Sequence, residues 1–544
     1  MRLLPGIVAV ALMAGGLTGC GAPVARTEML RHLGEGEPAK AKDNADDLWG
    51  TSQDEALGRH MDRGLLDHLD GQLATSTQEF DAAAPLVDDL RKTTVGNLVA
   101  TAVLNDSAGF FPGAPYEHTQ LDWYRSLNHL LTAQMVDHIW HPPYLLAAQR
   151  PGATPVVPEH LDPVKERERA IIIARRMTLN QLQETADAAS KDYYADDPFA
   201  RFYAGVAVLA LPPKERTEAD EQFATAMLKG SLGAYRKQAE TLGKTGIGFR
   251  YEAPAAPSAA TRLYLRQLRR YDPEEFAREQ ARLGVAPAPA GSGCLLVLHQ
   301  AGLIAKPEPL QIGLVAVGFH TPREPTPEQQ ARGHTQTQFS MGALGFMATG
   351  PGSEIAKTWG VIPIPGSLVQ QCLAPGGATV IGFELPAHPT DLPIAPLYSV
   401  QVGDAPGFTI GQPEVLADLD AYARANLKDR QPGTLVRTLS RVAVKQAAVA
   451  AAAQAARKND QGLLAFGINL VGSALMTATE SADLRSWSTL PDHIEGSLID
   501  LPPGTVQVRL GTYDLGPVRI EADRLSLVVL RTVPLPPIIT KDQP

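Results

Sequence analysis

The residues that could bind a metal or a nucleotide occur in two short stretches, and each departs from the pattern that its chemistry needs. His138 and His141 are three residues apart, a spacing that lets two histidines on one helix share a metal. Pro142-Pro143 would end such a helix, however, and no nearby glutamate completes an H-E-x-x-H motif. Gly243-Lys244-Thr245 resembles the end of a P-loop, but Gln238 stands where that loop requires glycine. We therefore predict no metal, no cofactor and no nucleotide partner.

The candidate nucleophiles also lack a supporting motif. Gln338-Phe339-Ser340-Met341-Gly342 lacks the first glycine of a G-x-S-x-G elbow. Cys294 lies in an apolar run, where burial would raise the pKa of its thiol and make it inert. An oxidising compartment would allow a disulfide between Cys294 and Cys372, but two unpaired buried thiols are the favoured interpretation. No catalytic residue is predicted, and we expect that the protein is not an enzyme.

Asp483, Arg485 and Trp487 form the sharpest local cluster of functional side-chain types. An acid, a base and an indole this close together could grip a ligand or a protein partner. Alternatively, Asp483 and Arg485 would pair, and Trp487 would plug a helical hairpin onto a β-domain. We favour this structural role over the binding role.

The elements that position these residues begin with an export signal. Arg2 precedes the apolar stretch Leu3–Met13, which is too short to span a bilayer. Leu17-Thr18-Gly19-Cys20 resembles a bacterial lipobox, so we predict a lipoprotein signal peptide over 1–19 and lipid attachment at Cys20. Two or three acyl chains would hold the protein on a membrane essentially permanently. Gly21 stands where an inner-membrane retention signal would have Asp, which favours the periplasmic face of the outer membrane; an ordinary secretory signal is the alternative.

The composition indicates a folded chain of several domains. Its 544 residues suggest two to four domains, and 44% hydrophobic with 20% charged residues is typical of globular proteins. The net charge of −10 argues against a nucleic-acid partner and against a polybasic membrane patch. Residues 20–48 are mostly polar after the cysteine, and we predict that they form a lipidated, flexible tether.

The stretch from 49 to 284 has the apolar periodicity of helices, as at Trp123 and Leu127. Proline- and glycine-rich loops separate the helices, and strand signals are few. Tyr124–Leu131 and Phe199–Gly205 resemble degenerate tetratricopeptide units. We predict an antiparallel, tetratricopeptide-like helical stack; since the 34-residue period is not clean, a plain helical bundle is the alternative.

The pattern of apolar residues changes after a boundary rich in Ala, Pro and Gly at 285–293, from helical periodicity to short apolar runs. Short apolar runs flanked by Gly or Pro are typical of the strands of a β-sandwich. The whole chain is thus predicted to be α+β, with a β-sandwich-like domain over 291–411 and 485–544, interrupted by a helical insertion over 414–484. The predicted strands lie in Cys294–Leu298, Leu310–Phe319, Val361–Ile364, Ala378–Phe383, Leu397–Val402, Val506–Val508 and Leu525–Leu530.

The insertion contains an apolar helical hairpin over 442–478. Leu463–Ala478 carries no charge, and Gly467 and Gly472 would let neighbouring helices pack closely. This segment is short for a membrane span, and Lys445 fits the edge of a protein better than a bilayer core. We predict a buried hairpin, with membrane insertion as the alternative.

Several blocks of sequence point to a known group of proteins. They are Gly113-Ala114-Pro115-Tyr116-Glu117 in the helical half, then Thr479–Trp487 and Leu501-Pro502-Pro503-Gly504. With these blocks, spread over about 100–511, the chain resembles an uncharacterised family of bacterial lipoproteins with tetratricopeptide-like N-terminal halves. The resemblance implies an anchored lipoprotein of mixed architecture and implies no reaction. The stretch Trp140–His160 departs from the compact repeat of that family.

These observations favour interaction over catalysis. We expect a lipid-anchored periplasmic scaffold or adaptor, in which the helical stack offers a concave surface to an envelope protein partner. One alternative is an envelope hydrolase or carbohydrate-binding protein with a site in the β-domain. Another is a membrane-active assembly subunit that inserts the 442–478 hairpin.

Overall fold

The computed structural model describes most of the chain and confirms the α+β class. The predicted lipid attachment at Cys20, the second cysteine Cys372 and the 442–478 hairpin lie outside the described residues. The described residues are 21–92, 110–148, 155, 161–187, 196–245, 257–322, 337–349, 378–389, 396–403, 409–430, 433–434, 437–438, 441 and 482–534.

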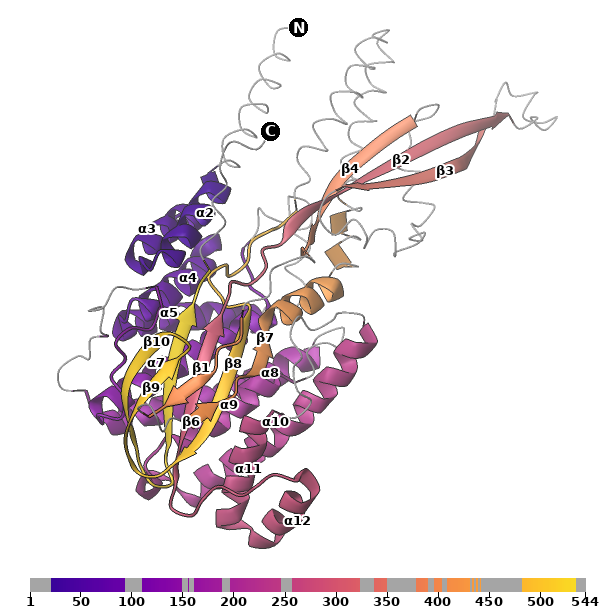
Figure 1. The fold of residues 1–544 in the computed structure, drawn as a ribbon. Coiled ribbons are helices and arrows are strands. Elements are labelled where there is room, and N and C mark those ends of the chain that lie inside the picture. Colours follow the sequence, from indigo (N-terminus) through magenta and orange to yellow (C-terminus); the bar gives the residue numbers. More distant parts are fainter. Residues whose placement is uncertain are drawn as a thin grey trace.

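The first half of the chain is helical, and each helix packs on the next one along the chain (Figure 1). Three of the helices begin with an Asp-Pro pair, at Asp162-Pro163, Asp197-Pro198 and Asp272-Pro273, where the aspartate caps free backbone N–H groups and the proline takes the first helical position. The helices are α2 (Gly21–Gly34), α3 (Pro38–Trp49), α4 (Ala56–Leu69), α5 (Leu73–Lys92), α7 (Pro115–Val136), α8 (Pro163–Asp187), α9 (Pro198–Leu209), α10 (Glu218–Thr245), α11 (Ser258–Tyr271) and α12 (Pro273–Leu283).

The flexible tether predicted for 20–48 is wrong from Gly21 onward, because this stretch forms α2 and α3. Apolar residues recur there at every fourth position and are buried against the neighbouring helices. The polar composition of the segment masks this spacing. The buried apolar residues at this spacing are Ala25, Met29 and Leu33 in α2 and Ala41, Ala45 and Trp49 in α3.

The second half contains two four-stranded sheets. In the first, with the order β11-β1-β8-β7, the central strand β1 is buried along its whole length, which suits its apolar sequence. β1 pairs parallel with β11 and antiparallel with β8. The second sheet has the order β10-β9-β5-β6. The strands are β1 (Gly293–Ala301), β5 (Val400–Val402), β6 (Thr409–Gly411), β7 (Glu414–Asp418), β8 (His493–Leu501), β9 (Gly504–Leu510), β10 (Tyr513–Ile520) and β11 (Leu525–Thr532).

The helical insertion predicted over 414–484 begins too early. Glu414–Asp418 forms strand β7, which pairs with β8, and the helix starts at residue 419. The apolar residues from Val415 to Ala417 satisfy a buried strand as well as a helix, and the free edge of β8 decides between the two.

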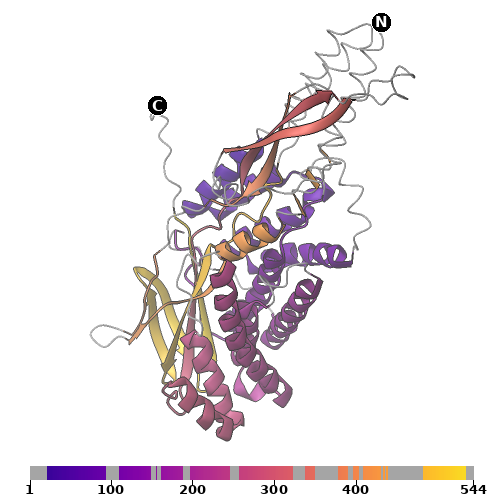
Figure 2. The same ribbon diagram turned by 90° about the vertical axis from the view of Figure 1, so that its right-hand side faces the viewer.

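A third sheet extends away from the body (Figures 1 and 2). It consists of β2 (Glu308–Pro322), β3 (Thr337–Thr349) and β4 (Ala378–Ala387), and β2 pairs antiparallel with both of its neighbours. We call this sheet the projection.

Among the helices that the structure describes, none has the length and apolar character needed to cross a membrane.

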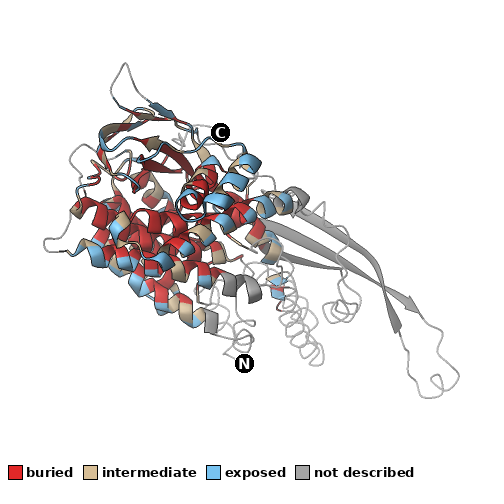
Figure 3. Ribbon diagram, turned by 90° about the horizontal axis from the view of Figure 1, so that it is seen from below, coloured by how far each residue is buried: buried red, intermediate tan, exposed pale blue. Residues whose placement is uncertain are grey.

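The inner side of the helical stack is covered by the chain's own strands. The side-chain amide of Gln134 on α7 bonds both backbone groups of Leu527, at 3.0 and 2.8 Å, and so acts like a neighbouring strand. The Tyr235 hydroxyl donates to the Leu416 carbonyl of β7 at 2.9 Å. Figure 3 shows the buried residues gathered where helices and sheets meet. At these positions the helices therefore pack against the chain's own strands.

Candidate functional site

The Asp483–Arg485–Trp487 cluster lies where the C-terminal strands meet the helices. The Arg485 guanidinium bonds both carboxylate oxygens of Asp483, at 2.9 and 2.8 Å, and reaches Glu55 at 2.8 Å. Burial opposes its charge, but the hydrogen bonds to these two carboxylates raise the pKa of Arg485. It also lies over the ring of Phe111, 5.8 Å from the centroid.

Trp487 is fully buried and packs against helices of the first half of the chain. Its ring lies 6.0 Å from those of Phe80 on α5 and Tyr124 on α7. Its backbone N–H donates to Glu117 at 2.8 Å, and its indole N–H donates to Thr489 at 3.0 Å. We expected it to join the hairpin to the β-domain, but these contacts join the β-domain to α5 and α7. The predicted Asp483–Arg485 pair is thus present, and Trp487 packs on α5 and α7.

A group of buried charges continues from Trp487 into the helices. Asp62 on α4 accepts hydrogen bonds from the Trp49 indole and the Thr489 hydroxyl, both at 2.7 Å. Arg26 on α2 donates to the carbonyl and hydroxyl oxygens of Ser486, each at 3.1 Å. Burial raises the pKa of Asp62 and lowers that of Arg26. Sequence reasoning missed both residues, because their partners Thr489 and Ser486 lie more than 400 positions away and no local pattern marks the contact.

A second buried polar group lies at the start of β8. The His493 ring bonds Asp492 through Nδ1 and Glu495 through Nε2, the latter at 2.9 Å, while His299 on β1 lies 3.4 Å from Glu495. Burial disfavours the charged imidazole, but the two carboxylates raise the pKa of His493 to about 9. Sequence reasoning missed this cluster, although the alternation of His493 and Glu495 along a strand was a usable signal.

An aspartate beside a histidine can orient a catalytic imidazole, as in hydrolase triads. Here the side chains of His493 and Glu495 are 0% and 1% exposed. Gly302, with a φ of +69°, packs so closely on Asp492 that a Cβ at this position would lie 2.4 Å from the carboxylate. The arrangement holds an ion pair inside the fold and offers no face of the imidazole to solvent.

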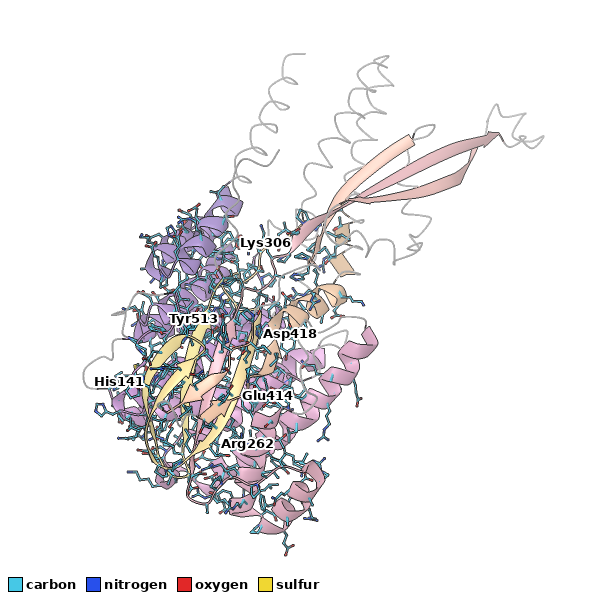
Figure 4. All side chains as sticks on the ribbon, in the orientation of Figure 1. His141, Arg262, Lys306, Glu414, Asp418 and Tyr513 are labelled. Carbon is cyan, nitrogen blue, oxygen red and sulfur yellow. The ribbon has the colours of Figure 1, made fainter. Side chains whose placement is uncertain are left out.

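The remaining candidates are separate from one another. Ring nitrogens of His138 and His141 lie 3.2 Å apart at an exposed position. Figure 4 shows His141 at the edge of the body. Gly243-Lys244-Thr245 forms the end of helix α10, so it is not the loop that follows a strand in nucleotide-binding folds. Ser340 lies in strand β3 of the projection.

The cysteine prediction is resolved for one of the two residues. Cys294 is a free, buried thiol at the start of β1, and burial raises its pKa to about 11. In the described part of the chain, one group has the spacing of metal ligands, formed by His32, Glu35 and Glu37 around the α2–α3 turn. Glu35 and Glu37 are paired with Arg31 and Lys40, so salt bridges account for this group.

Comparison with known proteins gave no match: no family model, no curated protein and no solved structure is significantly similar to this chain. The resemblance to a lipoprotein family therefore stays a prediction from the sequence blocks.

Proposed function

We propose that this protein is a lipid-anchored assembly protein of the cell envelope, without catalytic activity, and that its projection is the part that enters a lipid bilayer. The anchor is the lipid predicted at Cys20, and the location is the periplasmic face of the outer membrane. In the finer architecture of this proposal, the helices form a tetratricopeptide-like stack and the two four-stranded sheets form a sandwich. The partners are further copies of the same chain.

The observation that carries the proposal is the sequence of the projection. No residue from Pro309 to Pro322 or from Thr337 to Thr349 is charged. Because successive residues of a strand alternate between faces, the register of β2 with β3 and β4 places most of the leucine, isoleucine and phenylalanine residues on one face, which we call the bulky face. The other face holds glycine, alanine and valine residues together with Gln311, Met347 and Glu384. The bulky face holds Leu310, Ile312, Leu314, Leu344, Phe346, Ile381 and Phe383.

The dimensions of the projection suit a bilayer. β2 has 15 residues and β3 has 13, whereas a tilted strand needs about 9–11 residues to cross the hydrocarbon core. Within a bilayer every backbone N–H and C=O group needs a partner. Among the described strands, the outer edges of β3 and β4 have no neighbour, and pairing with further copies would satisfy them.

A flotation experiment tests the proposal without the acyl anchor. The mature chain carrying Cys20→Ser is mixed with detergent-solubilised phosphatidylcholine, the detergent is removed, and the vesicles are floated on a density gradient. We expect the protein to float with the vesicles. The pair Leu314→Lys and Phe346→Lys, opposite each other on the bulky face, should abolish flotation.

The matched control places two lysines on the other face, at Val317 and Ala343, which are also opposite each other. This variant should float like the parent chain. A parent chain that stays in solution, or two variants that behave alike, would show that the projection does not enter the bilayer.

A further inference from the structure

A cavity of about 370 Å³ opens at the end of the body formed by α11 and α12. Its wall comes from α11, the proline-rich linker 286–291, the start of β1 and the turn between β10 and β11. The lining contains one carboxylate, Asp523, and six arginines. The arginines are Arg216, Arg262, Arg266, Arg269, Arg270 and Arg524.

The arginines occupy different depths of the cavity. Arg216 and Arg524 form its floor, with side chains 2% and 3% exposed. The other four lie on α11, where positions 262, 266, 269 and 270 share one face of the helix. Arg262 binds the Leu498 carbonyl of β8 at 2.8 Å, which holds this helix face against the sheet (Figure 4).

The carboxylates near the cavity do not neutralise these arginines one for one. Glu221 is shared between Arg216, at 3.6 Å, and Arg270, at 3.9 Å. Asp500 is likewise shared between two arginines of α11, Arg262 and Arg266.

The two remaining arginines of the lining, Arg524 and Arg269, differ in how they are neutralised. Arg524 pairs with Asp137 at 2.7 Å and with Glu521 at 2.8 Å, and Asp137 is also bound by Arg167, at 2.6 Å. Within the described part of the chain, Arg269 binds the carbonyl of Ala288 and no carboxylate. The six arginines of the lining therefore outnumber the five carboxylates that lie in it or pair with it, inside a protein whose net charge is −10. These carboxylates are Asp137, Glu221, Asp500, Glu521 and Asp523.

We propose that this cavity binds a small phosphate-bearing molecule. Guanidinium groups bind oxyanions through paired N–H donors, and a phosphate offers three oxygens and nearly two charges to arginines that converge from several sides. A volume of about 370 Å³ is in the range of small-molecule sites. The cavity lies at the opposite end of the body from the projection, so a free phosphate compound is a better occupant than a lipid headgroup (Figure 1).

Calorimetric titration of the full chain with inorganic pyrophosphate tests this site. Arg269 and Arg270 lie exposed at its rim, so Arg269→Gln with Arg270→Gln should fold normally and bind pyrophosphate at least about tenfold more weakly. The matched control is Arg278→Gln with Arg282→Gln on α12, two exposed arginines outside the lining. It should bind like the parent chain.

A variant that binds pyrophosphate more tightly than the parent chain distinguishes an effect on binding from a loss of folding. Asp523→Asn removes the carboxylate of the lining and should tighten pyrophosphate binding several-fold. Asn tolerates the left-handed conformation of this residue, whose φ is 55°, so the turn is kept. Absence of binding, or equal binding by the rim and control variants, would overturn the proposal. Tighter binding of tricarballylate would overturn the phosphate assignment, and stronger competition by phosphatidic acid vesicles would overturn the free ligand.

Discussion

At the scale of single residues, polar groups inside this protein are held by partners far away in sequence. Asp62 bonds Trp49 on the neighbouring helix and Thr489 from the C-terminal half. Arg485 binds Asp483 beside it and Glu55 from the first helices. The local pair was predictable from sequence spacing, whereas the distant partners were not, because no periodicity relates positions 62 and 489.

Replacing Asp62 should be strongly destabilising. Asp62→Ala leaves the Trp49 indole and the Thr489 hydroxyl without their acceptor in a fully buried site. We expect a loss of about 3–5 kcal/mol in the free energy of unfolding, measured by urea denaturation. The control is Asp54→Ala, at an exposed position, which should change stability by less than about 0.5 kcal/mol. Equal effects of the two changes would contradict the role given to Asp62.

The thiol of Cys294 should be chemically silent in the folded protein. Burial raises its pKa to about 11, so almost no thiolate is present at pH 8. In a chain with Cys20→Ser and Cys372→Ser, iodoacetamide at pH 8 should leave Cys294 unmodified and should modify it completely in guanidinium chloride. Mass spectrometry measures both states. Rapid modification of the folded chain would show that the start of β1 is open.

At the scale of secondary-structure elements, sequence patterns predicted best where no charged residue interrupts the apolar residues of a strand. The apolar runs of β1, β2, β4, β9 and β11 were all assigned correctly. Strand β8 was missed because His493, Glu495 and Asp500 interrupt its apolar residues. These charges are tolerated there because each has a partner on the same or a neighbouring element. Helices α2 and α3 were missed for a related reason, since their exposed faces are highly charged.

The His493 cluster should make the stability of β8 depend on pH. The carboxylates of Asp492 and Glu495 raise the pKa of His493 from 6.5 to about 9 in the folded state, despite its burial. A raised pKa means that the stabilisation is fully present below about pH 6.5 and is lost as the pH rises through 9. The shift corresponds to about 3 kcal/mol.

Urea denaturation of the parent chain and of His493→Gln between pH 6 and pH 10 measures this effect. The free energy of unfolding of the parent should fall across the interval more steeply than that of the variant. Parallel curves would mean that the imidazole is neutral in the folded protein.

At the scale of the whole molecule, the helical and β halves form one folded unit. Sequence reasoning treated them as separate domains, because the change in texture near 285–293 is sharp. The structure shows a continuous apolar core that includes Trp123 of α7, Leu296 of β1 and Trp487. A composition boundary shows where one kind of element stops, and it gives no information on whether the two halves share a core. The arginine-lined cavity could not be predicted from the sequence for the same reason, since its arginines come from both halves.

A shared core predicts that the two halves unfold together. Gln134 bonds both backbone groups of Leu527, and Tyr124 donates to Gln300, so exposing the inner side of the helices also strips the strands of buried partners. Scanning calorimetry of the parent should therefore show one main transition. Gln134→Ala removes both bonds to Leu527 and should lower the midpoint of that transition without splitting it. Two well-separated transitions, with only the second moved by Gln134→Ala, would show that the halves are independent domains.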